Sequence, residues 1–446
     1  MRRFSRPVRR TGHIAAQALC AAALAVALPA GLPAAAPLDT ELSHLLQTHP
    51  RISAARKGIE ASEAGIDEAR SGYFPSVSLS GEVGPDYADS PSRRSVQGEA
   101  FSDTRRTSTL TVTQNLFEGF RTDAETRIAR LRKDVSSHTY RITEQTYLFN
   151  GIQAYLNVLK QSRLLDIAKI NEQTLQEQLQ LENARVERGS GLAVDVLQAK
   201  SRLQLARERV VTIFGDLRLA MSIYMQLYGR PAVPAEMSMP TPPRDALPET
   251  LEGAIEIAKA ENVVLRRSLT QVDIASEQRT VAESTYWPRI DIVGEGTLEK
   301  DTDGVAGINR EGKVVLRAVW DLFDGYLTPA KTARASAEYG VALDSRLETD
   351  RDVRDRVRRA WEQYRTSLAQ RDLLENAVNI AAEVFEARKK LRQRGRESVI
   401  VLLDAENELN NARLRYNAAV FDYTASAYRL LLQTGRLNPE TLGLPG

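Results

Sequence analysis

The chain has 446 residues, of which 42% are hydrophobic and 26% charged, and it contains one cysteine. A hydrophobic fraction of this size excludes a wholly disordered chain, and a single cysteine excludes a disulfide framework. The 60 basic and 58 acidic residues give a formal net charge of +2, so the chain lacks the basic excess that is typical of nucleic-acid-binding proteins.

Residues 1–36 have the pattern of a secretory signal peptide. Five arginines precede an apolar stretch over residues 14–28, and small residues and prolines follow. Since this stretch is too short to span a bilayer, we expect export and cleavage, at a point that the pattern does not fix. Removal would leave 55 basic and 58 acidic residues and no cysteine. No later segment has 18 consecutive apolar residues, so no membrane-spanning helix is expected beyond the signal.

The rest of the chain is an internal duplication. The sequence Asn-Leu-Phe-Glu-Gly-Phe at residues 115–120 corresponds to Asp-Leu-Phe-Asp-Gly-Tyr at 321–326, and the same offset carries Gly189 onto Gly395. Repeats of this kind determine the architecture. We therefore expect five segments: a signal peptide (1–36), a first repeat (37–230), a proline-rich linker (231–250), a second repeat (251–436) and a C-terminal tail (437–446).

Each repeat is predicted to contain a long helical hairpin. Residues 121–187 and 330–394 each contain one glycine and no proline, and apolar residues in the first segment recur at steps of three and four, as in packed helices. At about 1.5 Å per residue each segment reaches roughly 100 Å. An ordinary helical bundle would explain the heptads but not this length, because the mean helix has about 11 residues. Glycine-containing turns at 189–191 and 395–398 lead to return helices at 193–228 and 399–434.

Four shorter segments alternate apolar and polar residues, which predicts β-strands with one apolar face. They span residues 76–83, 109–113, 289–298 and 314–321, and the polar segments 84–105 and 300–312 are predicted to be loops. Four strands are too few for a bacterial membrane barrel, which has at least about eight. Either the sheet packs on the helices in water, or it closes with strands from other copies. Two copies would give eight strands and three would give twelve, and twelve leave more room for a pore.

These features resemble the TolC family of outer-membrane channel proteins over essentially the whole mature chain. The most specific parts are the duplicated strand–helix turns, the Gly-Tyr-Phe-Pro sequence at 72–75, and the hairpin-tip sequences at 191–199 and 402–409. The second tip sequence and the arginine-flanked tip at 185–191 are most similar to members that serve type I secretion. The strand–helix turn residues are Leu116, Phe117, Gly119, Leu322, Phe323 and Gly325.

The resemblance implies a mainly α fold with a small antiparallel β part. Duplicated long helical hairpins would form a trimeric α-barrel in the periplasm, continued by a twelve-stranded transmembrane β-barrel with four strands from each chain of a homotrimer. The resemblance also implies a passive exit duct without catalysis or a cofactor, surrounded by outer-membrane lipid. The duct would dock to a periplasmic adaptor (a membrane fusion protein), which connects it to an inner-membrane ABC or proton-driven pump.

By the same resemblance, the hairpin tips carry the channel entrance. Asp195 and Asp404 match acidic residues of the family's entrance, and three copies of Asp404 could ring the lumen and attract cations. The tip departs from the family pattern at Arg392, Glu397 and Val401, so the family's contacts are not carried over, and Arg394 or Arg396 could pair with Asp195 on a neighbouring hairpin instead. Each of these charges could equally be solvated at an exposed tip.

The candidates for the entrance are Asp195, Asp404, Arg392, Arg394, Arg396 and Glu397. The candidates for contact with the adaptor are Gly189, Ser190, Gly191, Leu192, Gly395 and Ser398.

Motifs for catalysis or metal binding are not found: there is no His-Glu-x-x-His, phosphate-binding glycine loop or Cys/His cluster. His44, His49 and His138 are expected to be structural or surface residues, since a metal site needs convergent ligands. The favoured function is an outer-membrane conduit for type I secretion, and a close alternative is the same channel serving a drug or metal efflux pump. A remote alternative is a periplasmic adaptor or structural coiled coil, against which the four amphipathic strands count.

Overall fold

The structure is a computed structural model that describes residues 37–303 and 305–444, so the predicted signal peptide lies outside the described residues. The elements are α1 (Leu38–Thr48), α2 (Pro50–Arg70), β1 (Ser76–Ala88), α3 (Pro91–Gln97), β2 (Phe101–Glu118), α4 (Arg121–Glu187), α5 (Ala193–Tyr228), α6 (Leu251–Glu261), α7 (Val263–Glu283), β3 (Arg289–Thr302), β4 (Val305–Val319), α8 (Leu327–Gln393) and α9 (Val399–Thr434). Short 3₁₀ turns lie at Ser71–Tyr73, Pro234–Glu236, Arg244–Ala246 and Ser284–Tyr286.

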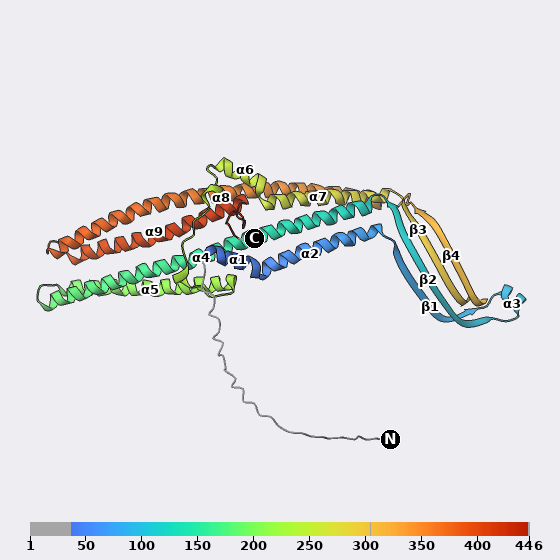
Figure 1. Ribbon diagram of the computed structural model, residues 1–446, viewed down its shortest axis with the longest axis horizontal. Helices are drawn as coiled ribbons and strands as arrows, with labels where there is room; N and C mark the ends of the chain where they lie inside the picture. Colours follow the sequence, from blue (N-terminus) through green and yellow to red (C-terminus); the bar gives the residue numbers. More distant parts are fainter. Residues whose placement is uncertain (1–36, 304, 445–446) are drawn as a thin grey trace, which may run out of the picture. The chain divides into compact units, whose positions relative to one another are not determined.

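Two long helical hairpins dominate the described part of the chain (Figure 1). Helices α4 and α8 have 67 residues each, which at about 1.5 Å per residue is roughly 100 Å. Helix α5 packs along α4 and α9 along α8, and the two hairpins meet where α4 contacts α9. The predicted long hairpins are therefore confirmed. Helix α8 begins three residues earlier than expected, because Pro329 lies in its first turn, where the missing N–H has no intrahelical partner in any case.

One of the return helices is more apolar than the sequence analysis anticipated. An 18-residue window of α5 is hydrophobic enough to cross a membrane by length and composition, yet only 17% of it is buried within the chain. A search for unbroken apolar runs misses this window because isolated charged residues such as Asp216 and Arg218 interrupt it. Helix α5 packs along α4 but leaves large apolar side chains such as Val211 and Leu219 exposed, so the window marks an exposed apolar helix face on the hairpin.

The four strands form one antiparallel sheet in the order β1-β2-β3-β4. The strands have 13, 18, 14 and 15 residues. The loop predicted at 300–312 is therefore wrong over most of its length, and the loop predicted at 84–105 is wrong at both ends, where β1 and β2 extend into it, and in its middle, where α3 lies. Pairing continues through polar residues such as Asp86 opposite Asp103 and Glu299 opposite Asn309. The reason is that ladder hydrogen bonds come from the backbone and need no apolar side chains.

Cross-strand pairing gives the sheet one apolar and one polar face. Val77 lies opposite Val112 and Leu79 opposite Leu110, and Ile292 lies opposite Leu316. The next positions carry polar pairs, for example Ser78 opposite Thr111 and Thr297 opposite Glu311.

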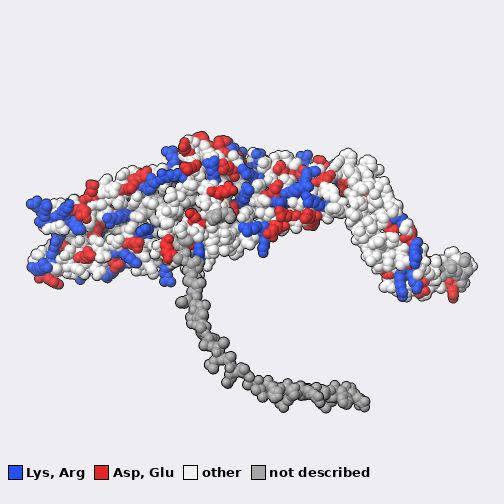
Figure 2. Space-filling model, viewed as in Figure 1, with Lys and Arg blue, Asp and Glu red and all other residues white. Residues whose placement is uncertain are grey.

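The apolar face is exposed: Leu79 is 76% accessible and Leu316 69%. In Figure 2 the strands near the helices are almost free of charge, and charged residues gather toward the far ends of the strands. A sheet packed on helices in water would bury this face, so that alternative is wrong.

The main core lies where α1, α4, α5 and α9 meet. Leu42, Leu45, Tyr155 and Tyr224 are fully buried there. The Arg230 guanidinium lies 2.7 Å from the fully buried Glu41 carboxylate. The core thus holds both hairpins near the middle of the long helices, and their turns lie far along those helices from the strands.

Candidate functional site

The two hairpin tips have the same backbone geometry. The turn glycines Gly189 and Gly395 have φ values of 75° and 72°, a conformation that glycine adopts at little cost. The N–H of Gly189 donates to the Val186 carbonyl at 2.9 Å, and that of Gly395 to the Arg392 carbonyl at 3.0 Å. The duplication inferred from sequence therefore extends to these turns. The adaptor candidates Gly189, Ser190, Leu192, Gly395 and Ser398 are exposed, and Gly191 is half-buried.

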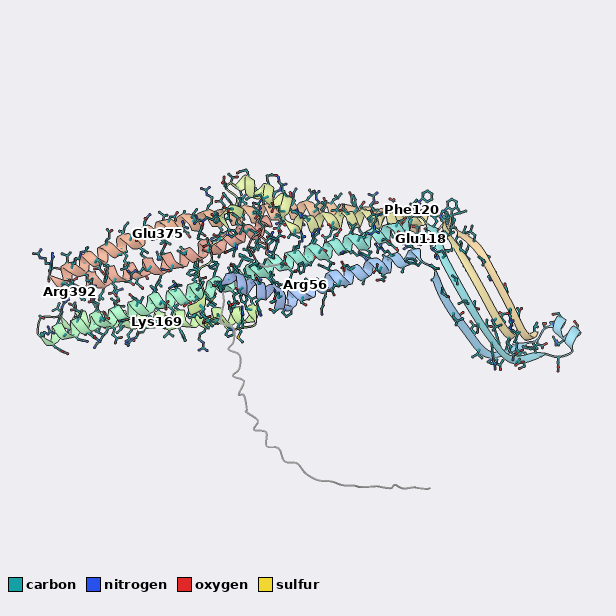
Figure 3. All side chains as sticks on the ribbon, viewed as in Figure 1. Arg56, Glu118, Phe120, Lys169, Glu375 and Arg392 are labelled. Carbon is teal, nitrogen blue, oxygen red and sulfur yellow. The ribbon has the colours of Figure 1, made fainter. Side chains whose placement is uncertain are left out.

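A cluster of charges joins the two hairpins just before their turns. We call Glu182, Arg185, Arg388, Arg392 and Glu397 the tip cluster. Arg392 Nη2 on α8 donates to both carboxylate oxygens of Glu182 on α4, at 2.9 and 2.8 Å, and Arg185 Nη1 donates to the same carboxylate at 2.8 Å. Figure 3 labels Arg392 near the turn of the second hairpin.

The second hairpin orients Arg392 from its own turn. Arg392 Nη1 donates to the Glu397 carbonyl at 3.0 Å, and Arg388 Nη1 donates to the Glu397 carboxylate at 2.5 Å. The Glu182 side chain is 2% exposed and that of Arg392 18%. Because breaking a buried ion pair costs more than breaking a surface pair, this contact can hold the hairpins together.

Glu182 was not among the residues singled out from the sequence, although the sequence contains a signal for it. Counting along α4, Glu182 follows Leu179 by three residues and precedes Val186 by four. It therefore occupies a position in the apolar stripe, where a charge is tolerated when it is paired.

The remaining entrance candidates are not brought together within one chain. Asp404 lies 2.7 Å from Arg202 on α5, in a pair whose side chains are 56% and 38% exposed. Asp195 is half-buried, and Arg394 and Arg396 are exposed. Among the described residues these three form no ion pair, so the pairing of Asp195 across chains stays a prediction.

The strand–helix turns are also repeated in detail. Phe117 and Phe120 meet edge to face at 5.5 Å between ring centroids, and Phe323 and Tyr326 do the same at 5.5 Å. Figure 3 shows Glu118 and Phe120 at the junction of β2 and α4. A Cβ on Gly119 would lie 2.4 Å from the Ser284 carbonyl oxygen, so this turn requires glycine.

An acidic side chain stabilises the start of each long helix. Asp324 accepts hydrogen bonds from the N–H groups of Leu327 at 3.1 Å and Thr328 at 2.8 Å, and from the Thr328 hydroxyl. These hydrogen bonds lower the pKa of the Asp324 carboxyl. In the first repeat Glu118 accepts from the Thr122 hydroxyl. Asp324 therefore satisfies free N–H groups at the start of α8, whereas Glu118 contacts the first turn of α4 only through a side chain.

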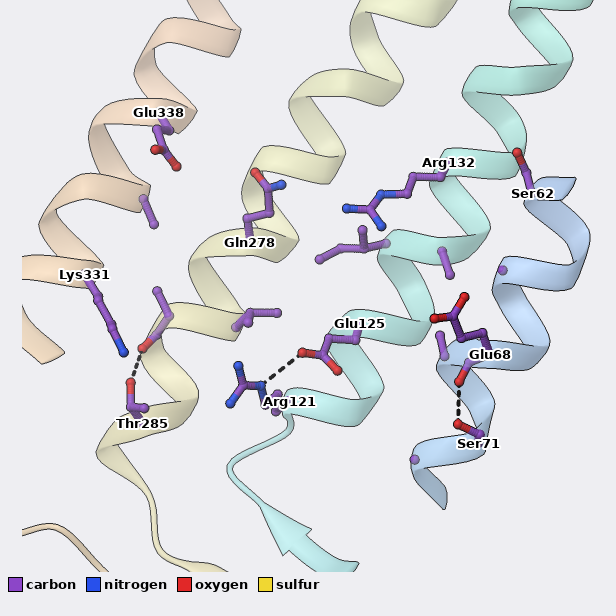
Figure 4. A pocket seen from close by; sticks show the side chains of 18 of the residues that line it. Ser62, Glu68, Ser71, Arg121, Glu125, Arg132, Gln278, Thr285, Lys331 and Glu338 are labelled. Atoms are coloured by element: carbon purple, nitrogen blue, oxygen red, sulfur yellow. Dashed lines mark hydrogen bonds and ion pairs between the residues drawn. The ribbon is translucent and has the colours of Figure 1, made fainter. Parts of the chain in front are cut away.

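A polar groove runs over four helices near the strands. It has a volume of about 1130 Å³ and is lined from α2, α4, α7 and α8 (Figure 4). Its charged lining includes Arg121 and Glu125, whose side chains lie 3.0 Å apart, together with Arg132, Lys331 and Glu338. A wall with this lining suits contact with water. Among the described residues no group of three or more His, Cys, Asp or Glu side chains could hold a metal ion.

An antiparallel sheet with an exposed apolar face, continued by two long hairpins with a polar wall, defines a subunit of an outer-membrane channel. The chain belongs to the outer membrane efflux protein family, which matches residues 42–222 and 254–436. It is thus an outer-membrane channel protein with a periplasmic extension, and the predicted resemblance to TolC is confirmed. The family consists of channel proteins rather than enzymes.

Known relatives cover most of the chain. The outer membrane efflux protein BepC of Brucella suis is 24% identical over 403 residues, which are 88% of this chain and 84% of that protein. The alkaline protease secretion protein AprF of Pseudomonas aeruginosa is 25% identical over 414 residues, 90% and 84% of the two chains. The Campylobacter jejuni outer membrane channel CmeC has the same fold, with a TM-score of 0.78 at 14% identity over 90% of this chain and 85% of that one.

Proposed function

We propose that three copies of the chain assemble into a passive exit duct across the outer membrane. The observation that carries this proposal is the open sheet: β1 and β4 are its edges, and neither pairs with a further strand among the described residues. Lipid cannot satisfy open strand edges, so a membrane sheet must close. Because β1 and β4 run in opposite directions, β4 of one copy can pair with β1 of the next, and three copies give twelve strands.

We further propose that the duct serves type I secretion. The arginine-flanked first tip and the second tip sequence support this assignment, as does the similarity to AprF, whose name describes protease secretion. BepC is named as an efflux protein, so an efflux pump remains the second candidate. In both cases the energy comes from an inner-membrane pump, an ABC transporter for type I secretion, and this chain supplies the path.

The tips are the proposed docking surface for the adaptor. Around the second turn Lys390, Arg394 and Arg396 are exposed, whereas the first turn exposes Leu192 and Val194 beside Glu187 and Arg188. An adaptor that presents acidic side chains to the second tip and apolar ones to the first would complement this surface. The tip cluster, between these surfaces, is proposed to hold the entrance closed.

Crosslinking from the tips tests the assignment. Single cysteines at Ser190→Cys and Arg396→Cys would carry a photoreactive crosslinker in intact cells, and Ser345→Cys, exposed on α8 far from the turn, is the control. We expect the two tip variants to capture an adaptor that co-purifies with an ABC exporter, and the control to capture none. Capture of an efflux adaptor would select the second candidate. A detergent-extracted protein that is stably monomeric would overturn the channel itself.

A further inference from the structure

The seam between the hairpins contains a buried carboxylate that the proposed duct does not use. Glu406 on α9 is 5% exposed, and neither of its carboxylate oxygens has a hydrogen-bond partner among the described residues. Like Glu182, it occupies an apolar stripe, four residues after Leu402 and three before Leu409, both of which are buried. Unlike Glu182, it accepts no hydrogen bond from an arginine of the described chain, and an unpaired buried charge is costly.

A cavity of about 80 Å³ adjoins Glu406, with walls from α4, α8 and α9. Phe385 and Leu409 supply apolar surface, and Asn171 on α4 and Asn410 on α9 supply amide groups. A buried water needs about 10–15 Å³ of such space and two or more polar partners, so the cavity can hold several waters. It lies across the contact between the first and second hairpins, which is the contact that must loosen when the tips separate.

The charges around Glu406 only partly offset the effect of burial on the pKa of its carboxyl. Burial raises the pKa of the Glu406 carboxyl to about 7, and Lys389 on α8 opposes the rise. Arg413 on α9 lines the cavity without donating a hydrogen bond to the carboxylate. From α4 the cavity receives Asn171 and Thr174, which carry no charge, and the Thr174 hydroxyl donates to the Ile170 carbonyl. Within the part of the chain that the structure describes, Glu406 therefore forms no ion pair.

We propose that Glu406 is a proton-binding site that couples pH to the separation of the two hairpins. This inference rests on the proposed duct and describes its regulation. With the proton bound, the neutral carboxyl packs in the α4–α9 seam. When the proton leaves, the carboxylate needs water, which the seam provides only by opening toward solvent.

The direction in which pH changes the stability of the packed seam follows from the two pKa values of the Glu406 carboxyl. A carboxyl of ordinary pKa near 4.5 in the separated state and about 7 in the packed state binds its proton more tightly when packed. The packed seam is therefore fully stable below pH 4.5, loses stability as pH rises to about 7, and changes little above that. Within this window the ratio of separated to packed hairpins rises by up to tenfold for each pH unit.

Single-channel conductance of the purified full-length protein in planar bilayers measures this effect between pH 5 and 8. In the wild type we expect the open fraction to rise between pH 5 and about 7 and then to level off. Glu406→Gln keeps the shape and remains neutral, so its open fraction should stay low and change less than twofold. Glu408→Gln is the matched control, because Glu408 is exposed two residues further along α9; it should behave as the wild type does.

Two further measurements keep the test valid if the variant folds poorly. Spin labels on Ser190→Cys and Arg396→Cys report hairpin separation directly, and heat-modifiable oligomer in outer membranes reports folding. A wild type that conducts equally at all pH values, or a folded Glu406→Gln protein with the wild-type pH profile, would overturn the inference and leave the duct intact. A protein that conducts at no pH would instead overturn the proposed duct.

Discussion

Replacing Arg392 by alanine should release the tip cluster. The change removes two contacts of 2.9 and 2.8 Å to the Glu182 carboxylate and one of 3.0 Å to the Glu397 carbonyl. Hydrogen bonds to charged groups contribute about 1.5–3 kcal/mol, and Arg185 remains on Glu182, so we expect a loss of roughly 2 kcal/mol per chain. Since about 1.4 kcal/mol is tenfold in an equilibrium constant, each entrance contact should open about 30-fold more readily.

Planar-bilayer recordings at fixed pH and salt measure the open fraction of Arg392→Ala channels. The matched control is Arg365→Ala, which removes an exposed arginine of α8 that lies far from the tip and forms no ion pair within the described residues; it should cost less than about 0.5 kcal/mol. A double-mutant cycle with Glu182→Gln isolates the Glu182–Arg392 coupling. If Arg392→Ala channels stay closed like the wild type, or if Arg365→Ala channels open as far, the tip cluster does not hold the entrance.

Three further changes test the sheet, the lumen and the turns. Leu79→Arg should lower the amount of folded oligomer in outer membranes, because a charge on the lipid face destabilises a barrel by about 2–4 kcal/mol near the bilayer midplane. Thr111→Arg on the polar face should be tolerated, and an equal loss of oligomer from both variants would contradict the assigned faces. Asp404→Ala should weaken cation selectivity, and an unchanged reversal potential would exclude a ring of Asp404. Gly119→Ala should unfold at a clearly lower temperature than Gly325→Ala, because both glycines have positive φ but only the first would clash with backbone; equal melting temperatures would show that φ strain alone matters.

The four helices of the hairpins could be predicted to within three residues because their limits are local. A run without proline covers all of α4 and all of α8 after its first turn, and turn glycines with positive φ separate the two long helices from the return helices. The lengths of the strands could not be predicted, because alternation of apolar and polar residues marks only the part of a strand that has one apolar face. Beyond Val83 in β1 the alternation stops at Gly84 and Pro85, while backbone pairing continues to Ala88.

Some residues of the candidate site could also be predicted from the sequence, and others could not. The turn residues Gly189 and Gly395 follow from the duplication, and both lie at equivalent turns. The partner of Arg392 could not be predicted, since it depends on how the two hairpins are aligned across the α4–α9 seam. An acid in an apolar stripe, such as Glu182 or Glu406, is the sign in the sequence that such a partner or a proton is required.

The two unpaired edges of the sheet also affect each chain before it is inserted into the membrane. A lone copy in water presents 13 residues of β1 and 15 of β4 as ready templates for any extended peptide. Such a chain is prone to aggregate during its passage from the secretion machinery to the lipid. We therefore expect a chaperone to cover both edges until strands from other copies of the chain pair with them.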